Sequence, residues 1–342
     1  MTIDKDLIKQ IKITPILESL KLEDISDEVY FGDRYSKNYI SNSRLGVLKK
    51  EGAKAFFEGI PQTYNPSFTT GTLIHQQLLQ PESFEVIGEV FKPSAKAGLM
   101  ADYLYNSDGT TPTDDDIKSA SYKIGYYKDK LTSNRLKEFR QKAEPYWRDR
   151  FIYEQNNPIG NKERVYTDEK NYELLCNCLK TLNSDENIQK LLHPISIVTE
   201  PIVGNEKTIL LDIKMEVPGY EPRIYKLKAK LDNFSIDFDE ETITVNDLKT
   251  TSRPASMFDP EYFSYQRELS FYSYLLKLCA QHIYKIEKPT IKGNFLVVST
   301  VPDYNTRVYP MTSKLFKSGW NEALYLLRCV YILNVIYGYE FQ

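Results

Sequence analysis

The chain has 342 residues, of which 41% are hydrophobic and 27% are charged, with 15 glycines and 17 prolines. This composition is typical of a folded protein and excludes collagen-like, low-complexity and largely disordered classes. The 44 Lys and Arg residues against 47 Asp and Glu residues give a net charge of −3, so a DNA contact needs a local basic surface or bound cations.

Targeting signals and thiolate metal sites are not indicated. Residues 1–17 contain no apolar run of signal-peptide length, and the apolar stretch 326–337 is interrupted by Arg328 and Asn334. We therefore expect a cytoplasmic protein without a membrane association. Among the four cysteines only Cys176 and Cys178 are close together, and their spacing within a helical pattern does not match zinc or iron–sulfur ligands. Reduced cysteines are the better interpretation.

The first 38 residues are polar and mixed, and we predict that they form a peripheral N-terminal arm. From Tyr39 the pattern becomes helical, with Ser41 or Ser43 as the N-cap and apolar residues at helical spacing behind it. A second helix is expected near Thr70. It contains His75 and should end before the proline at position 81.

A turn-rich acidic break at 106–116 precedes a helical and basic stretch. From Lys118 to Arg150 there are ten Lys and Arg residues against four Asp and Glu residues. Such a face is most often simply solvated, but it is also the best candidate for a surface that follows DNA phosphates. The predicted DNA contacts on it are Arg135, Lys137 and Arg140.

The same stretch carries four aromatic residues that can stack on unpaired bases, Tyr126, Tyr127, Tyr146 and Trp147. Most of the 26 tyrosines of the chain are expected in the core or half-buried. Further helical patterns at about 169–182 and 187–194 follow. Residues from about 106 to 192 are therefore expected to form an all-helical insertion.

After residue 194 the hydrophobic period changes from 3.6 residues to 2. Four successive strands are predicted, within 195–204, 207–217, 223–234 and 242–250. A helix from 261 to 280, a strand at 293–301 and a helix from about 318 to 337 complete the chain. This order predicts an α/β or α+β fold in which residues 39–342 form a single domain that contains the insertion.

The clearest chemical pattern is Asp232 with Asp247 and Lys249. Residues two apart on a strand project from one face, so Asp247 and Lys249 point the same way, and the predicted hairpin brings Asp232 beside them. Such a group can bind one or two Mg²⁺ ions, or Mn²⁺, and hydrolyse a phosphodiester. Asp232 and Asp247 are the predicted ligands, and Lys249 is predicted to orient the nucleophile or to stabilise the transition state.

Two further metal ligands are candidates, His75 through nitrogen and Glu200 as a carboxylate. Spacing alone does not assign either of them. The alternatives are an ordinary core or exposed histidine for His75 and a solvated strand end for Glu200. A D-x-K triplet by itself is also most often a surface ion pair.

The order of these motifs resembles the PD-(D/E)XK nuclease superfamily, in the branch of phage and prophage exodeoxyribonuclease VIII (RecE-like) and lambda-type exonucleases. The resemblance runs from GTLIHQQLLQPESF through EPIVGN, KAKLDNF and NDLKTT to a Tyr-rich helix, and it covers roughly residues 39–300. It implies a restriction-endonuclease-like core with a mixed central sheet flanked by helices. It also implies metal-site roles for His75, Glu200 and Asp232, and the (D/E)XK pair at Asp247 and Lys249.

One position departs from the family pattern, which places a Gln four residues before a Tyr on the helix after D-x-K. Here the residue four before Tyr272 is Glu268, and the nearby glutamine is Gln266. Helical spacing turns Gln266 away from the stripe of Glu268 and Tyr272. We infer that Glu268 takes the place of the glutamine at the rim of the catalytic site, with a surface carboxylate as the alternative.

The resemblance implies a metal-dependent DNA exonuclease of phage or prophage origin that acts in the host cytoplasm. Such an enzyme digests linear duplex DNA for recombination or repair. The resemblance further implies a ring-like homo-oligomer and a single-strand annealing protein as partner. Two alternatives remain open, namely a structure-selective or single-strand nuclease of the same fold in replication, and a catalytically inactive DNA-binding protein.

Overall fold

The computed structural model describes residues 5–59, 66–125, 131–158 and 160–341. The chain forms two compact units, the first made of Met1–Thr63 and Thr181–Gln342 and the second of Tyr64–Lys180. The second unit begins well before the predicted insertion. Residues before position 106 belong to this unit in part because strand β3 (Phe84–Ile87) pairs in parallel with β4 (Glu163–Tyr166).

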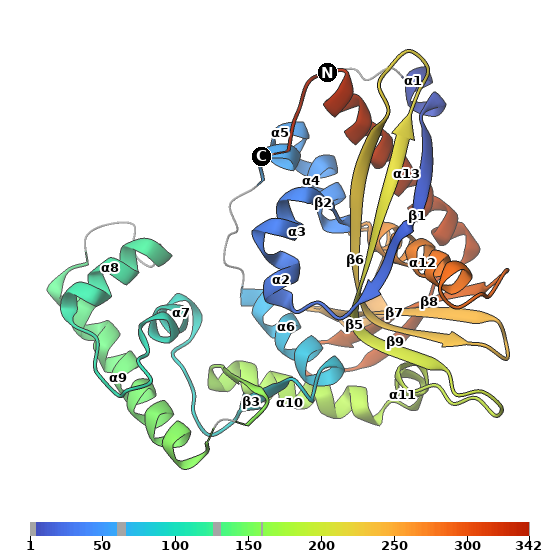
Figure 1. Cartoon of the computed structure of the whole chain (residues 1–342). Coiled ribbons are helices and arrows are strands. Elements are labelled where there is room, and N and C mark those ends of the chain that lie inside the picture. The colour runs from blue at the N-terminus through green and yellow to red at the C-terminus, as the bar shows by residue number, and fades with distance from the viewer. Residues whose placement is uncertain (1–4, 60–65, 126–130, 159, 342) are drawn as a thin grey trace. The chain divides into compact units, whose positions relative to one another are not determined.

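The first unit is built on a seven-stranded mixed sheet with the order β1-β5-β6-β7-β8-β9, to which β2 attaches beside β6 (Figure 1). Strands β7 and β8 run parallel, as do β2 and β6, and the other neighbours run antiparallel. The predicted mixed α/β class is confirmed. The strands are β1 (Lys12–Glu23), β2 (Tyr39–Ile40), β5 (Ile202–Glu216), β6 (Arg223–Asp237), β7 (Thr242–Thr251), β8 (Thr290–Ser299) and β9 (Thr306–Pro310).

The N-terminal segment differs from the predicted peripheral arm. Strand β1 pairs antiparallel with β5, from Lys12 opposite Glu216 to Glu23 opposite Thr208, and forms an edge of the sheet. Its residues are mostly half-buried rather than buried, because an edge strand keeps much of its surface in solvent. The sequence therefore reads as polar and mixed although the segment belongs to the sheet.

The predicted strand at 195–204 is mostly irregular, and β5 begins only at Ile202. Residues 195–200 are largely exposed. They are held to the turn between β6 and β7, because Ser196 Oγ donates to the Asp239 carboxylate at 2.6 Å and Thr199 N donates to it at 3.0 Å. The alternation of apolar residues in this segment therefore does not correspond to a strand.

The helices of the first unit flank this sheet. The predicted N-cap at Ser41 is confirmed, since its hydroxyl accepts from Arg44 N at 3.3 Å. Gly52, with a φ of 87°, divides the predicted helix in two. Among the described residues, none of the helices is both long and apolar enough to cross a membrane. The helices of the first unit are α1 (Lys5–Gln10), α2 (Asp27–Phe31), α3 (Asp33–Asn38), α4 (Asn42–Glu51), α5 (Ala53–Glu58), α11 (Glu186–Leu192), α12 (Tyr265–His282) and α13 (Ser313–Val335).

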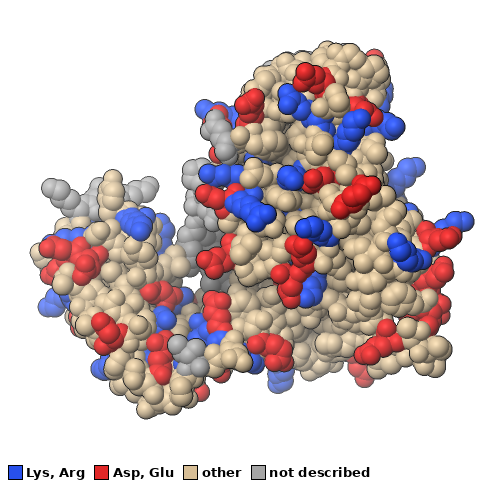
Figure 2. All heavy atoms as spheres, viewed as in Figure 1, with Lys and Arg blue, Asp and Glu red and all other residues tan. Residues whose placement is uncertain are grey.

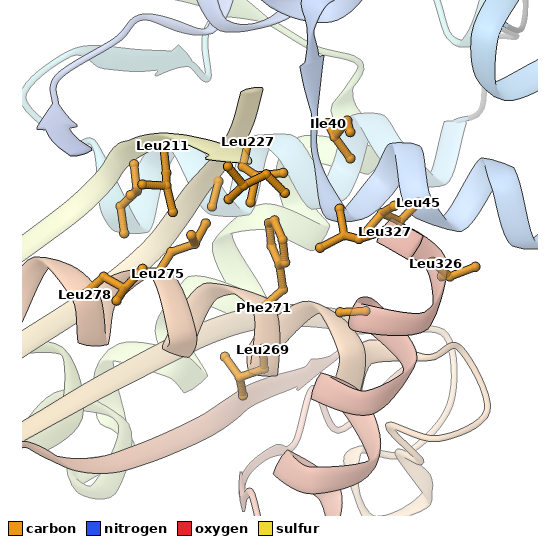
Figure 3. Packing of buried hydrophobic residues seen from close by; sticks show 14 of the residues in the cluster. Ile40, Leu45, Leu211, Leu227, Leu269, Phe271, Leu275, Leu278, Leu326 and Leu327 are labelled. Atoms are coloured by element: carbon orange, nitrogen blue, oxygen red, sulfur yellow. The ribbon is translucent and has the colours of Figure 1, made fainter. Parts of the chain in front are cut away.

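The core of the first unit lies where α12 and α13 pack against the sheet (Figure 3). On α12 the buried residues Phe271, Leu275 and Leu278 follow helical spacing and face Leu211 and Leu227 of β5 and β6. Burying one such side chain stabilises the fold by about 1.5–3 kcal/mol. This packing fixes α12 on the sheet and thereby fixes the polar residues at its start.

The second unit has a core of its own and is not all-helical, because β3 and β4 form a two-stranded sheet in it. Tyr146 and Trp147, predicted to stack on bases, are 2% and 7% exposed and belong to this core. Tyr126 and Tyr127 lie outside the described residues. Its helices are α6 (Pro66–Leu79), α7 (Ala95–Leu104), α8 (Asp114–Ile124), α9 (Ser133–Asn156) and α10 (Glu169–Ser184), whose last residues belong to the first unit.

Helix α2 covers a buried lysine of β6 in the first unit. Lys228 is 4% exposed, donates from Nζ to the Tyr30 carbonyl at 2.6 Å and lies 3.9 Å from the centroid of the Tyr30 ring. Burial lowers the pKa of Lys228 to about 8, and the charge of Arg44 adds to this effect. The folded protein therefore binds this proton less tightly than the unfolded chain does.

This difference predicts a pH-dependent effect of the variant Lys228→Met. Between pH 8 and pH 10.5 the native wild type loses the proton while the unfolded chain keeps it, so the unfolding free energy of the wild type should rise relative to the variant by up to about 3 kcal/mol. Urea unfolding at both ends of this range measures the change. The exposed Lys226 provides the control variant Lys226→Met, and a difference that is constant with pH for Lys228→Met would contradict the prediction.

Candidate active site

The predicted acidic pair meets where strands β6 and β7 separate. Backbone pairing between the two strands ends at Asn233 opposite Asn246, and the same register places Asp232 opposite Asp247. Beyond this point the Asp232 carboxylate replaces the backbone partner, because its Oδ2 accepts a hydrogen bond from Leu248 N at 2.7 Å. The two carboxylates therefore lie side by side at the end of the pairing.

Lys249 joins this strand pair to helix α12. Its Nζ lies 2.8 Å from Asp247 Oδ2 and 3.2 Å from Glu268 Oε2. The hydroxyl of Tyr272 donates to the other oxygen of Glu268 at 3.1 Å. The structure thus brings Asp232, Asp247, Lys249 and Glu268 together in the first unit.

Helix α12 presents Glu268, rather than Gln266, to Lys249. Gln266 is 6% exposed and lies where α12 packs on α13. Its backbone carbonyl accepts from Ser270 Oγ and lies so close to Gly319 of α13 that a Cβ there would collide with it. The two residues differ by 200° around the helix axis, which is why only one of them reaches the sheet.

Sequence reasoning missed Glu206 and selected Glu200 instead. Glu200 is exposed and precedes β5, and the structure does not bring it to this group. The pairs on either side of Glu206, Asn205 opposite Asn233 and Lys207 opposite Leu231, place Glu206 opposite Asp232. Carboxylate oxygens of Glu206 and Asp232 lie within 4.8 Å of each other.

Strand β6 changes the face that it turns to the core at this point. Buried apolar residues occupy odd positions up to Leu231 and even positions from Phe234 onward. Opposite this change Glu206 has a φ of 52°, a left-handed conformation that is rare for residues other than glycine. Such strained conformations cluster at functional sites.

A row of four asparagines lies beside the carboxylates and connects β5, β6, β7 and β8. Asn246 Nδ2 donates to Asn233 Oδ1 at 2.7 Å, Asn233 Nδ2 donates to Asn205 at 2.8 Å, and Asn294 Nδ2 donates to Asn246 at 2.9 Å. Each of the first three asparagines neighbours one carboxylate in sequence. Because buried amides need such partners, the row favours the register that places the carboxylates next to one another.

Negative charge exceeds positive charge at this position. Among the residues that the structure describes, the ammonium groups paired with these carboxylates belong to Lys249 and to Lys230, which also pairs with Asp27 of α2 and lies 3.4 Å from Glu206. Burial raises the pKa of Asp247, Lys249 opposes this effect, and the charges of Glu268 and Asp232 raise the pKa further. The four carboxylates that share this environment are Glu206, Asp232, Asp247 and Glu268.

The group fits a hard divalent cation. Asp247 Oδ2 is buried, and apart from the Lys249 ammonium no hydrogen-bond donor among the described residues reaches it. Carboxylate oxygens are the donor set that Mg²⁺ and Mn²⁺ prefer. A cation would supply a second partner for Oδ2 and further positive charge.

Lys249 is held in its charged form. Burial alone would lower the pKa of Lys249, but the charges of Asp247, Glu268 and Asp232 outweigh burial and raise the pKa well above its usual value. The side chain is therefore an ammonium that donates hydrogen bonds.

The remaining predicted site residues lie in the second unit. His75 is half-buried on α6, and its role as a metal ligand stays a prediction. On α9, Arg140 is 2.6 Å from Asp114 and 3.0 Å from Glu144, so acidic neighbours neutralise it. Lys137 is exposed and Arg135 is half-buried. On the face shown in Figure 2, blue and red side chains are interspersed.

Comparisons with known proteins give matches among solved structures. No family model and no curated protein matches the sequence. Among solved structures, the chain is similar to the crystal structure of a candidate exonuclease from Eubacterium rectale, with 13% sequence identity and a TM-score of 0.38. The match covers 91% of this chain and 86% of the other. A similarity this distant assigns no activity to this chain.

Proposed function

We propose that this protein is a metal-dependent deoxyribonuclease that hydrolyses phosphodiester bonds. The observation that carries this proposal is the assembly of Asp232, Asp247 and Lys249 at one point of the sheet, completed by Glu206 and Glu268. Metal-dependent hydrolysis of a phosphodiester uses a cation site, a positioned water and a positive group near the phosphate. This group of side chains can supply all three.

Glu206, Asp232 and Asp247 are the residues that would hold Mg²⁺ or Mn²⁺, as one or two ions, with Glu268 beside them. When bound, such an ion supplies Lewis-acid polarisation of the phosphoryl oxygens and favours deprotonation of water. The leucine amide that binds Asp232 holds this carboxylate in a fixed orientation. Preorganised ligands lose little entropy when the ion and the substrate bind.

Lys249 would hold the attacking water or the phosphoryl oxygens by hydrogen bonds from its ammonium. Asp247 and Glu268 fix it from two sides, so its position is set before substrate arrives. A fixed positive group at the place where negative charge develops lowers the activation free energy. The buried, mutually repelling carboxylates cost folding free energy, which favours an enzyme over an inactive DNA-binding protein.

Within this class we propose an exonuclease of linear DNA that serves recombination or repair, encoded by a phage or prophage. The order of the motifs along the chain supports this finer proposal. A single-strand annealing protein as partner and a homo-oligomer belong to the same proposal. The second candidate, a structure-selective or single-strand nuclease, uses the same side chains and differs only in substrate.

A cleavage assay separates these functions. End-labelled linear duplex, closed circular duplex and single-stranded DNA are incubated with Mg²⁺, Mn²⁺ or a chelator, using wild type and Asp247→Asn. We expect the linear duplex to be lost from its ends, only with metal and only with wild type. Cleavage restricted to single strands or circles would replace the exonuclease by the second candidate. If none of the substrates is cleaved in a metal-dependent way, the nuclease proposal is wrong.

DNA contact by helix α9 gives a further prediction. Charge reversal at Arg135, Lys137 and Arg140 should weaken binding to linear duplex and flatten its salt dependence. For the exposed Lys137 alone, Lys137→Glu should reduce the slope of log K against log salt by roughly one. Binding is measured in chelator over a series of salt concentrations. Lys118→Glu is the control, since Lys118 is already paired with Asp115 at 3.0 Å. An unchanged slope in Lys137→Glu would contradict the predicted contact.

A further inference from the structure

A row of aromatic rings leads from the Lys249 ammonium to solvent. Lys249 Nζ lies 4.9 Å from the centroid of the Tyr265 ring, and the Phe263 ring lies 5.3 Å from that of Tyr265. The Tyr262 ring follows at 4.6 Å from Phe263, edge to face. The outer two side chains, Tyr262 and Phe263, are 75% and 53% exposed. We call Tyr262, Phe263 and Tyr265 the ring row.

The ring row is carried by an anchored segment. Tyr265 stacks on Phe258 at 5.8 Å with an interplanar angle of 8°. The backbone before it is tied to the chain beyond β8, because Arg307 donates to the Ser256 carbonyl at 3.0 Å. At the other end Lys49 of α4 donates to Ser264 Oγ at 2.9 Å. These contacts hold the exposed rings in a defined position, although their exposure to water costs hydrophobic free energy.

We propose that the ring row binds an unpaired nucleobase of the strand whose phosphate lies at the carboxylates. This inference rests on the proposed nuclease function and adds a base-binding subsite to it. Each base has a flat π face that stacks on aromatic side chains regardless of sequence. Because the row begins at Lys249, a strand held there by a phosphate can extend its bases along the rings.

The charges of the segment favour a base over a phosphate at the rings. Asp259 and Glu261 are exposed beside them, and these carboxylates repel a phosphate but not a neutral base. Arg253, at the start of the segment, is exposed and makes no ion pair within the described part of the chain. It can hold a backbone phosphate away from the rings. The occupant is therefore a single-stranded stretch or a frayed end.

The test measures binding without cleavage. In chelator, fluorescence anisotropy follows binding of a labelled single-stranded oligonucleotide and of an abasic oligonucleotide of equal length. We expect the double variant Tyr262→Ala, Phe263→Ala to bind the normal oligonucleotide at least about tenfold more weakly than wild type does. The double variant and the wild type should bind the abasic oligonucleotide with the same affinity. Met257→Ala, at an exposed residue of the same segment outside the ring row, should change neither affinity.

The variant Phe263→Trp supplies a direct readout of stacking. Its fluorescence should be quenched by the normal oligonucleotide and not by the abasic one, because only a stacked base covers the new indole ring. Equal binding of both oligonucleotides by wild type and double variant would overturn the inference while leaving the nuclease function intact. Loss of self-association in the double variant, seen by gel filtration, together with unchanged base-dependent binding would make the row a contact between copies. If wild type neither binds nor cleaves DNA, the nuclease function itself fails.

Discussion

Replacing Lys249 with methionine is expected to reduce the cleavage rate of linear DNA by about 100-fold or more while the protein still folds. Methionine keeps much of the apolar stem and removes the ammonium that lies between Asp247 and Glu268. Loss of one preorganised donor to a developing negative charge costs about 10²–10³ in rate. Single-turnover rates on end-labelled duplex at saturating Mg²⁺ measure the effect without a contribution from product release.

The second unit offers a closely matched control. Lys92 is 16% exposed and pairs with Asp102 at 2.6 Å, whereas Lys249 is 17% exposed and pairs with Asp247 at 2.8 Å. Lys92→Met removes an ammonium of the same burial and pairing, so it should cost similar stability and leave cleavage unchanged. If both variants lose activity to the same extent, damage to the fold explains the loss and the catalytic role of Lys249 is wrong. Lys249→Arg should not restore the rate, because a planar guanidinium does not replace a point charge.

The part of the site that depends on local spacing follows from the sequence. Asp247 and Lys249 are two residues apart on one strand, and Glu268 shares a helical stripe with Tyr272, so periodicity alone determines which side chains lie on one face. The order of the elements likewise predicts a mixed sheet. These features can be predicted without knowing how strands that are distant in the sequence pair with one another.

The position of Glu206 could not be predicted in this way, because it depends on register. Strands β5 and β6 pair symmetrically about Gly219, whose φ of 86° is the left-handed conformation of a tight turn. Counting equal distances from Gly219 places Asp232 opposite Glu206 and not opposite Glu200. The V-P-G turn therefore indicates the register of the hairpin. The register was missed because two separate strands were predicted before Arg223, where the structure has the single strand β5.

Burial explains another difference between prediction and structure. Composition placed base-stacking aromatics in the basic stretch, where the structure buries Tyr146 and Trp147. The exposed rings lie instead before α12, at Tyr262 and Phe263. The sequence of an aromatic segment does not tell whether its side chains pack in a core or face solvent. Only the tertiary contacts of the segment decide between the two.

A divalent cation is expected to raise the midpoint of thermal unfolding, and this effect should depend on the carboxylates. A ligand at a hundred times its Kd stabilises the native state by about 2.7 kcal/mol, which corresponds to a rise of roughly 5 °C or more for a unit of this size. Melting curves in chelator and in millimolar Mn²⁺ measure this rise. It should be lost in Asp232→Asn and in Asp247→Asn.

The matched control is Asp212→Asn on β5, a carboxylate 24% exposed and paired with Lys226, outside the carboxylate group. It should keep the full rise with Mn²⁺. In chelator, Asp247→Asn removes a buried charge that Glu268 and Asp232 repel, but it also removes a partner of Lys249, so the rise with Mn²⁺ is measured for each variant from its own melting temperature in chelator. An equal rise in all three variants would place the cation elsewhere and contradict the proposed site. Since melting needs no substrate, the result bears on metal binding whether or not DNA is cleaved.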